Sequence, residues 1–276
     1  MKKLLSILIL VLIFSGSAFA AGHKVGMISH VNSTEEEFKT FTEELRAKGS
    51  VRFFSAVHTA DEVPSFVFYD SFISMLMAIN AGEIDEMFLP EAVGEYIINT
   101  TGGKYFEACV LRAIPVSYSF GFRKNDDPKL KNKFNEALKS MKADGSLQTL
   151  LAKYIYEAGI DEPETVNFEK FENAPTVKAA VTGDLPPIDF MKADGTPAGF
   201  NTAVLAEIAK RLKINIELVS IESGARSASL ASGRSDVVFW FQLFNAAASQ
   251  PDIPEAIVLS EPYYSFSEFL HIAVKK

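Results

Sequence analysis

The chain has 276 residues, of which 48% are hydrophobic, 22% charged and 12% aromatic, and its formal net charge is −8. This composition excludes a disordered or fibrous protein and is typical of one large or two smaller globular domains. The single cysteine, Cys109, excludes an intramolecular disulfide, and the four scattered histidines lack a metal-binding spacing. An acidic chain without basic clusters argues against nucleic acid as a partner. We therefore expect neither a metal nor a cofactor.

The first twenty residues form a separate segment. Two lysines at positions 2 and 3 precede an apolar run from Leu4 to Phe14, and the segment ends on Ala18-Phe19-Ala20. This is the pattern of a secretory signal peptide, and the run is shorter than the roughly 20 apolar residues that a membrane-spanning helix needs. We expect cleavage after Ala20 and a periplasmic, monomeric product. Because no cysteine sits at the cleavage site, we do not expect a lipoprotein.

Strands and helices alternate along the rest of the chain, which predicts an α/β fold. Strands are predicted at 24–28, 51–56, 66–69, 84–89 and 117–123, and helices after Ser33 or Thr34, after Asp70 or Ser71, from Pro90 and from Pro128. Residues 157–175 are polar, with two prolines and five glutamates, and form the best linker candidate. The alternation then resumes, with strands predicted at 177–181, 214–219, 236–241 and 268–274 and helices from Asn201 and Ser223.

Two stretches share one internal pattern. Residues 65–89 and 214–240 each contain a strand, a helix that ends at a glycine, and an Asp three positions later that opens a second strand. Glycine after a helix is common, so chance explains the pattern as well as shared architecture does. If the pattern reflects two lobes of similar build, a cleft between them at the carboxyl ends of the strands is a natural ligand site.

Four segments carry motifs of a known family. Residues 177–212 contain a strand, Gly-Asp-Leu-Pro-Pro, an Asp-Gly turn, Gly-Phe and a helix, and residues 260–264 read Ser-Glu-Pro-Tyr-Tyr. Residues 67–98 and 118–155 provide the other two matches. Together they resemble the family 3 extracellular solute-binding proteins, which are periplasmic receptors for amino acids and related solutes. The resemblance covers nearly all of residues 24–274 and implies an α/β, two-lobe, periplasmic-binding-protein-like fold (type II).

The order of these segments differs from the order in the family. The segment that closes the family's chain, 118–155, here precedes the opening segment at 177–274. The resemblance therefore implies a circular permutation, with lobe two at 22–115 and lobe one at 116–276, and with the original ends joined through the linker 157–175. We expect a single crossover near Ile114–Ser117, and a strand at Glu268–Val274 that ends at the hinge, close to Lys24. A fragmentary tandem of two receptors is the alternative.

The resemblance also implies a ligand site between the lobes. Arg226, with Ser223 three residues before it, matches a position at which some members bind a ligand carboxylate, and a guanidinium can grip a carboxylate with two parallel hydrogen bonds. A solvated surface arginine is the alternative. Asn32, Ser33 and Thr34 precede a helix whose N-terminal N–H groups can bind an anion, a role that can coexist with ordinary capping.

Four further residues are candidates for ligand contact. Strand alternation sends Trp240 and Gln242 to one face and the neighbouring Phe239 and Phe241 to the other, so that Trp240 can form an apolar wall. The other candidates are Asp184, before the double proline, and Glu91.

The family's usual amino-acid clamp is not visible in this sequence. Glu91 follows Pro90, which stands where the family commonly has an Asp for the ligand's ammonium group, and Phe244 is not followed by the Arg that the family uses for the α-carboxylate. An amino acid remains the family's usual ligand, but the ligand expected here is any small polar solute with at least one carboxylate.

We therefore expect a solute-binding protein that delivers its ligand to an ABC-type membrane transporter. Two alternatives remain: a dehydratase-like periplasmic enzyme on the same fold, with Asp184 or Glu91 as its acid, and a ligand-sensing module of a membrane receptor. The sequence shows no pairing of a nucleophile with a base, which favours a binding protein over an enzyme.

Overall fold

A computed structural model describes residues 23–29, 52–54, 64–158, 161–244, 253 and 255–275. The predicted signal peptide and the predicted helix start at Asn32–Thr34 lie outside these residues. Within them the fold is α/β, as expected, and no helix in the described part of the chain is long and apolar enough to cross a membrane.

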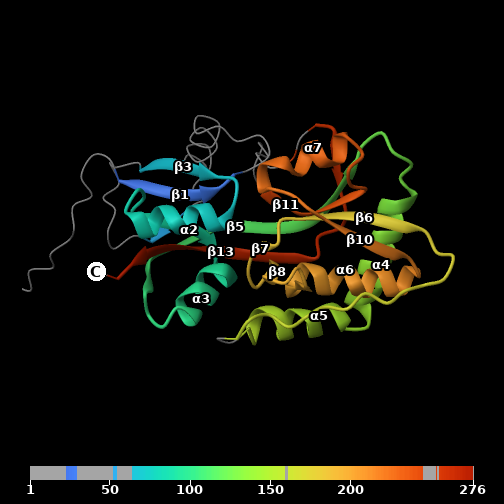
Figure 1. Ribbon diagram of the computed structural model, residues 1–276, viewed down its shortest axis with the longest axis horizontal. Helices are drawn as coiled ribbons and strands as arrows, with labels where there is room; N and C mark the ends of the chain where they lie inside the picture. The colour runs from blue at the N-terminus through green and yellow to red at the C-terminus, as the bar shows by residue number, and fades with distance from the viewer. Residues whose placement is uncertain are drawn as a thin grey trace, which may run out of the picture.

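One ten-stranded mixed sheet runs through the molecule (Figure 1). Its central path has the order β10-β6-β11-β5-β13-β4-β1-β3, and β2 and β12 pair with β5 beside this path. The bounds are β1 (Lys24–Ile28), β2 (Arg52–Phe54), β3 (Ser65–Tyr69), β4 (Glu86–Pro90), β5 (Tyr105–Arg123), β6 (Thr176–Val181), β10 (Asn215–Ser220), β11 (Val237–Phe244), β12 (Ile257–Leu259) and β13 (Tyr264–Val274). A separate three-stranded sheet contains β7 (Asp184–Leu185), β8 (Asp189–Met191) and β9 (Pro197–Ala198).

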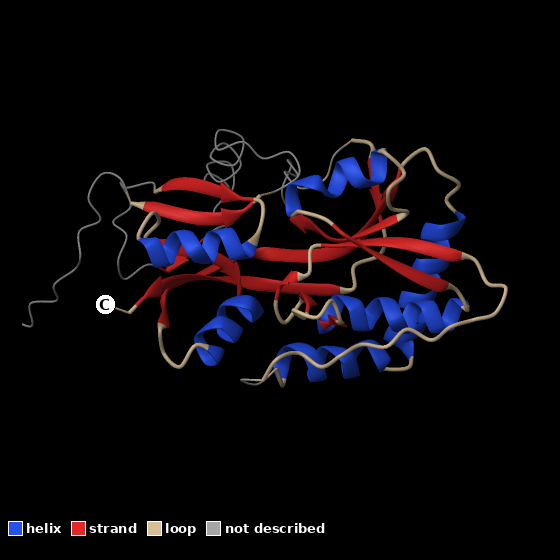
Figure 2. Ribbon diagram, viewed as in Figure 1, coloured by secondary structure: helices blue, strands red, loops and turns tan. Residues whose placement is uncertain are grey.

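The strands and helices form two lobes. Lobe two contains β1, β3 and β4 with two helices, α2 (Phe72–Ala81) and α3 (Glu91–Thr100). Lobe one contains β6, β10 and β11, the small sheet, and α4 (Lys129–Ala143), α5 (Ser146–Leu151), α6 (Gly199–Leu212) and α7 (Arg226–Ala231), with a π-helical turn at Ala152–Tyr156 and a 3₁₀ turn at Ser223–Ala225. Figure 2 shows α7 on one side of the lobe-one strands and α4, α5 and α6 on the other.

Two long antiparallel strands, β5 and β13, join the lobes. β5 pairs with β11 of lobe one, and β13 pairs with β4 of lobe two, where Phe269 faces Pro90 and Ile272 faces Met87. The two strands also pair with each other from Tyr264 opposite Tyr118 to Val274 opposite Tyr105. The expectation of a single crossover is therefore wrong, because the apolar strand at the end of the chain continues past the hinge. The lobe boundary at 115/116 stays a prediction.

The end of β13 and the start of β1 lie at the same end of the strands of lobe two. β4 separates them: its Glu86 faces Val25 of β1, and its Met87 faces Ile272 of β13. The prediction that β13 ends near Lys24 agrees with this register, but the prediction that it ends at the hinge is wrong. Strand neighbours lie roughly 4.8 Å apart, so the two chain segments are separated by about two strand spacings. Circular permutation stays a proposal.

Helix α2 illustrates why these residues adopt this structure. Its apolar residues Phe72, Met75 and Ile79 recur at helical spacing and are buried against the sheet. The Ser71 hydroxyl caps the first turn by accepting a hydrogen bond from Ser74 N, and Gly82 ends the helix at φ 75°. Both signals were predicted from the sequence, and they place the N-terminus of α2 at the boundary with lobe one.

Candidate functional site

The turn between β3 and α2 touches lobe one at two points. Phe72 N, the first helical N–H of α2, donates to Asp184 Oδ2 at 2.7 Å, and Ser223 N donates to Asp70 O at 3.0 Å. A methyl group on Gly224 would lie 2.9 Å from Asp70 Oδ1, so the two backbones approach closely. We call these five residues, Asp70, Phe72, Asp184, Ser223 and Gly224, the lobe junction. Ser223 and Asp184 were predicted to contact a ligand, and in this structure both contact the other lobe.

Arg226 lies directly behind the junction. Its side chain is fully buried, its Nε donates to Ser223 O at 3.0 Å and its Nη1 donates to Trp240 O at 2.9 Å. The guanidinium carbon lies 4.0 Å from the centre of the Trp240 ring, a stacked cation–π arrangement. The alternative of a solvated surface arginine is therefore wrong. These contacts fix the plane of the guanidinium.

Trp240 adopts a backbone conformation that is unusual for a bulky residue. Its φ is 43°, in the left-handed region that costs a side chain with a Cβ roughly 1–2 kcal/mol. Trp240 N donates to Tyr263 Oη at 3.2 Å, and the indole Nε1 donates to Asp189 Oδ2 at 3.1 Å. Together with the bond from Arg226 to its carbonyl, these contacts hold the strained residue in place. Such over-determined strain is typical of functional sites, which motivates the proposal below.

A β-bulge explains this conformation. Val238 faces Gly121 on β5 and Phe241 faces Ser119, so β11 has one residue more than its partner in this interval. Gly121 leaves room for the Phe241 ring, since a Cβ there would lie 2.2 Å from the ring. The predicted alternation is consequently wrong: Phe239 joins the main core cluster, whereas Phe241 packs with Val238 in a smaller one.

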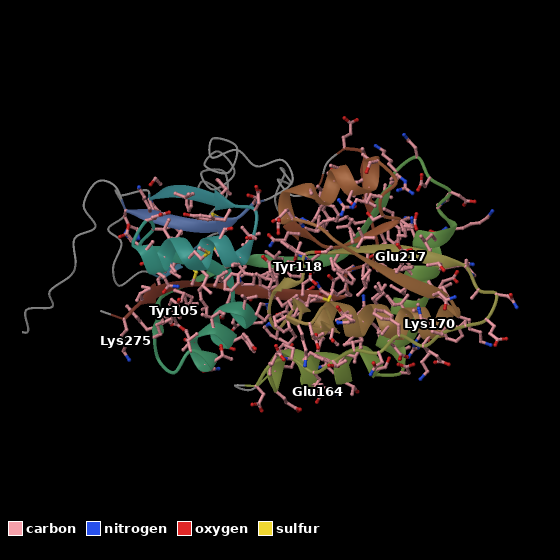
Figure 3. All side chains as sticks on the ribbon, viewed as in Figure 1. Tyr105, Tyr118, Glu164, Lys170, Glu217 and Lys275 are labelled. Atoms are coloured by element: carbon pink, nitrogen blue, oxygen red, sulfur yellow. The ribbon has the colours of Figure 1, made fainter. Side chains whose placement is uncertain are left out.

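Gln242 lies on the same strand as Trp240, and both side chains contact Tyr118. Gln242 Nε2 donates a hydrogen bond to Tyr118 Oη at 3.3 Å, and the centre of the Tyr118 ring lies 6.0 Å from the centre of the Trp240 ring. Tyr118 stands near the middle of the molecule (Figure 3). The structure thus brings together Ser223, Arg226, Trp240 and Gln242 from the predicted set.

Asp189 was not predicted and belongs to this cluster. It is fully buried, and its Oδ2 accepts from Thr182 N at 3.0 Å, from Thr182 Oγ1 at 2.8 Å and from the Trp240 indole. Burial raises the pKa of this carboxyl. Asp189 Oδ1 and both side-chain amide atoms of Asn201 are buried without a hydrogen-bond partner. A sequence signal existed, because a carboxylate between Ile188 and Phe190 interrupts an apolar stretch.

Asp184 has an unusual electrostatic environment. Its pKa is raised from an ordinary 3.8 to about 6: burial is the largest cause, the hydrogen bond from Phe72 N opposes it, and the negative charges of Asp189 and Glu222 add to it. Glu91 begins α3 and, with Glu95, adds to the burial that raises the pKa of Tyr264 on β13. Glu91 therefore influences Tyr264, whereas Gln242 and Trp240 both contact Tyr118.

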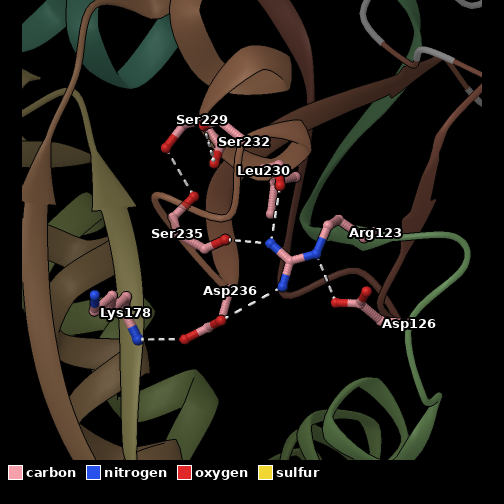
Figure 4. A network of polar contacts seen from close by, with 8 residues as sticks. All are labelled: Arg123, Asp126, Lys178, Ser229, Leu230, Ser232, Ser235 and Asp236. Carbon is pink, nitrogen blue, oxygen red and sulfur yellow. Dashed lines mark hydrogen bonds and ion pairs between the residues drawn. The ribbon is translucent and has the colours of Figure 1, made fainter.

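A polar network supports the helix that carries Arg226 (Figure 4). Arg123, at the end of β5, donates through Nη1 to Leu230 O at 2.9 Å and to Ser235 O at 2.6 Å, and its Nε donates to Asp126 Oδ2 at 2.7 Å. Asp236 in turn accepts from Lys178 N at 2.9 Å. The network ties the end of α7 to β5 and β6, and this anchoring fixes where Arg226 lies.

A cavity of about 200 Å³ opens beside this network and shares no residue with the lobe junction. It is lined by Phe122, Arg123, Lys124, Asp126, Asp127, Pro128, Leu130, Lys131, Asp236 and Val258. Across the described part of the chain, no group of three His, Cys, Asp or Glu side chains could hold a metal ion.

Most residues of the candidate site lie in a segment that matches a known protein family. Residues 177–275, which contain Asp184, Ser223, Arg226, Trp240 and Gln242, match the model of the bacterial extracellular solute-binding proteins, family 3. The resemblance seen in the sequence is thus confirmed over these residues. No curated protein sequence matches the chain significantly.

Several solved structures are similar over most of the chain. The ligand-binding component of an ABC-type import system from Staphylococcus aureus, with zinc bound, is 9% identical with a TM-score of 0.45, over 92% of this chain and 66% of that one. The aliphatic sulphonate-binding protein SsuA from Escherichia coli is 9% identical with a TM-score of 0.38, over 93% and 62%. The methionine-binding protein MetQ is 12% identical with a TM-score of 0.42, over 92% and 84%. The chain therefore spans less than two thirds of the length of the first two.

Proposed function

We propose that this chain, whose residues 177–275 match the family 3 extracellular solute-binding proteins, captures a small polar solute between its two lobes. The observation that carries the proposal is the buried Arg226–Trp240 pair behind the lobe junction, within the matched segment. Two lobes joined by two strands can close on a ligand by bending at the shared strands. Delivery to an ABC-type membrane transporter follows from the family, and a membrane sensor is the other recipient for such a protein.

The proposed ligand bears at least one carboxylate. A guanidinium held in a fixed plane by Ser223 O and Trp240 O is suited to a planar anion. Gln242 supplies an amide and Trp240 an apolar wall, and the helix start that the sequence predicts at Asn32–Thr34 is the candidate for further N–H groups. A ligand that contacts both lobes favours the closed arrangement, because only that arrangement offers both sets of contacts.

Several finer features belong to the same proposal. We infer export through a signal peptide cleaved after Ala20, a monomeric periplasmic product and a circularly permuted chain order. The start of β1 and the end of β13 both pair with the start of β4, and this proximity supports the permutation, since the family's chain passes directly between the matching strands. An unpermuted chain would need only a short connection there.

A second candidate function is an enzyme on the same fold. One observation favours it: the pKa of Asp184 is raised to about 6, in the range of a general acid at neutral pH. Incubating the protein with small hydroxy and keto carboxylates and analysing the products by mass spectrometry separates the two functions. Turnover would favour the enzyme, and retention of an unchanged ligand favours the binding protein.

The deciding experiment identifies the ligand and then removes Arg226. Mass spectrometry of the solute released from purified protein names the ligand, and calorimetry measures its affinity. Arg226→Ala should weaken binding by roughly 2–5 kcal/mol, the range for truncating one partner of a buried charge pair. Arg226→Lys keeps the charge without the planar fork and should also bind more weakly. Arg234→Ala is the matched control, because Arg234 is an exposed arginine of the same lobe. Unchanged affinity in both Arg226 variants would remove Arg226 from the site.

A further inference from the structure

Asp184 makes a direct side-chain contact between the lobes. Its Oδ2 accepts the 2.7 Å hydrogen bond from Phe72 N, so a carboxyl of lobe one occupies the N-terminus of α2 in lobe two. The first N–H groups of a helix have no partner within the helix, and a carboxylate from another element can satisfy one of them. β7 belongs to lobe one and α2 to lobe two. This bond therefore exists only while the two lobes are in contact.

The groups around Asp184 are acidic. Asp189 on β8 and Glu222 before the 3₁₀ turn both act on it electrostatically, and Asp70 lies on the opposite side of the junction against Gly224. The positive end of the α2 dipole is the opposing influence. A negative charge on Asp184 is therefore held in a partly buried place among other negative charges, where a neutral carboxyl fits better.

We propose that Asp184 is a positioning residue for lobe closure, and that closure is coupled to the uptake of one proton from solvent by its carboxyl. In the closed arrangement the neutral carboxyl accepts the Phe72 N–H and stays partly buried. When the proton leaves, repulsion from the neighbouring acids and the cost of burying the charge favour separation of the lobes.

The direction of the pH dependence follows from linkage. Burial raises the pKa of Asp184 from 3.8 to about 6 in the closed arrangement, whereas a solvated carboxyl in the open one titrates near its ordinary value. The closed form therefore holds the proton more tightly, and the ratio of closed to open molecules rises as pH falls through this interval. The rise reaches up to about tenfold for each pH unit between about 6 and 4, and the ratio is constant above about pH 7.

The test measures the distance between the lobes without any ligand. Fluorophores attached at Met77→Cys on α2 and Lys170→Cys in lobe one, in a Cys109→Ala background, report the distance by energy transfer between pH 4 and 8. Both attachment sites are exposed, and Lys170 is labelled in Figure 3. Wild-type protein should show more closed molecules at pH 4.5 than at pH 7.5. Asp184→Asn, which is neutral at every pH and keeps the acceptor oxygen, should stay closed throughout.

Glu217→Gln is the matched control. Glu217 is an exposed acidic residue of lobe one, so the variant loses the same charge elsewhere and should keep the wild-type profile. The variants also separate Asp184 from histidines, because His23 and His271 are unchanged in both. A flat wild-type profile, or an Asp184→Asn protein with the same profile as wild type, would overturn the proposal. Since no ligand is used, failure to find a ligand would count against the proposed function and leave this result intact.

Discussion

Two carboxyls that are wholly or partly buried, one in each lobe, have pKa values shifted in opposite directions. Glu86, at the start of β4, is buried, and burial alone would raise its pKa, but hydrogen bonding and charge from His23 and His271 lower it to about 2. Its Oε2 lies 2.7 Å from His271 Nδ1 and 3.6 Å from His23 Nε2. Asp184 at the lobe junction has one backbone N–H and acidic neighbours. The comparison shows that partners rather than burial decide whether a buried carboxyl is a fixed structural charge or a group that can respond to pH.

The largest expected effect comes from removing the structural charge. Glu86→Ala should lower the free energy of unfolding by roughly 3–5 kcal/mol, because it leaves buried imidazoles without their carboxylate. Urea denaturation at pH 7 measures the change, with Glu83→Ala, an exposed glutamate of the preceding turn, as the control. If the two variants had the same denaturation midpoint, Glu86 would not be the stabilising partner of the histidines.

The pH dependence of stability should separate the two carboxyls by sign. The lowered pKa of Glu86 contributes roughly 3 kcal/mol of stability that is fully present above about pH 4.5 and lost as pH falls towards 2. The raised pKa of Asp184 acts oppositely, adding stability as pH falls from about 6 to 3.8. Urea unfolding at a series of pH values tests both. In Glu86→Gln the free energy of unfolding should no longer fall between about pH 4.5 and 2. In Asp184→Asn it should no longer rise as the pH falls from about 6 to 3.8. A decrease below pH 4 that survived in Glu86→Gln would assign it to other groups.

The third prediction concerns Asp189. Asp189→Ala should destabilise the protein by about 1–3 kcal/mol, because Thr182 N and the Trp240 indole lose their buried acceptor. Trp240 is the chain's only tryptophan, so its emission reports this contact directly and should shift to longer wavelength. Asp189→Asn keeps an acceptor oxygen and should retain most of the wild-type emission. Identical spectra for wild type and Asp189→Ala would show that Asp189 does not hold the indole.

The smallest expected effect lies at the cap of α2. Ser71→Ala removes the hydroxyl that accepts from Ser74 N at 3.1 Å, and should cost about 1 kcal/mol. Ser74→Ala is a close control, since it keeps both the Ser71 acceptor and the Ser74 backbone donor. Thermal unfolding compares the two variants, and a cost at Ser74 equal to that at Ser71 would mean that the cap contributes little.

Local signals in the sequence predicted local structure well. Ser71 and Gly82 mark the two ends of α2, and the alternating elements predict the α/β fold. Of the predicted site residues, Ser223, Arg226, Trp240 and Gln242 lie together, and their contact with a ligand stays a prediction. These signals succeed because capping and periodicity depend on neighbours along the chain.

Features that depend on distant packing were not predicted. The bulge at Trp240 requires the Phe241 ring to pack against Gly121, more than a hundred residues away. The contact of Asp184 with Phe72 joins two lobes, and the continuation of β13 into lobe two depends on pairing with β4. Periodicity shows that a segment is a strand, but it does not show where along that strand the pairing partner changes.

The position of β13 has a consequence for how the chain acquires its structure. β13 lies between β5 and β4 in the middle of the sheet, yet the ribosome makes it after every other strand described here. Neither lobe can complete its hydrogen-bonded sheet until residues 264–274 have emerged and paired with β5 and β4, whose residues were made about 145 to 185 positions earlier. Such late, long-range pairing is intrinsically slow. Translation order thus delays completion of both lobes together, and the nascent chain stays incompletely folded until synthesis of β13 is over.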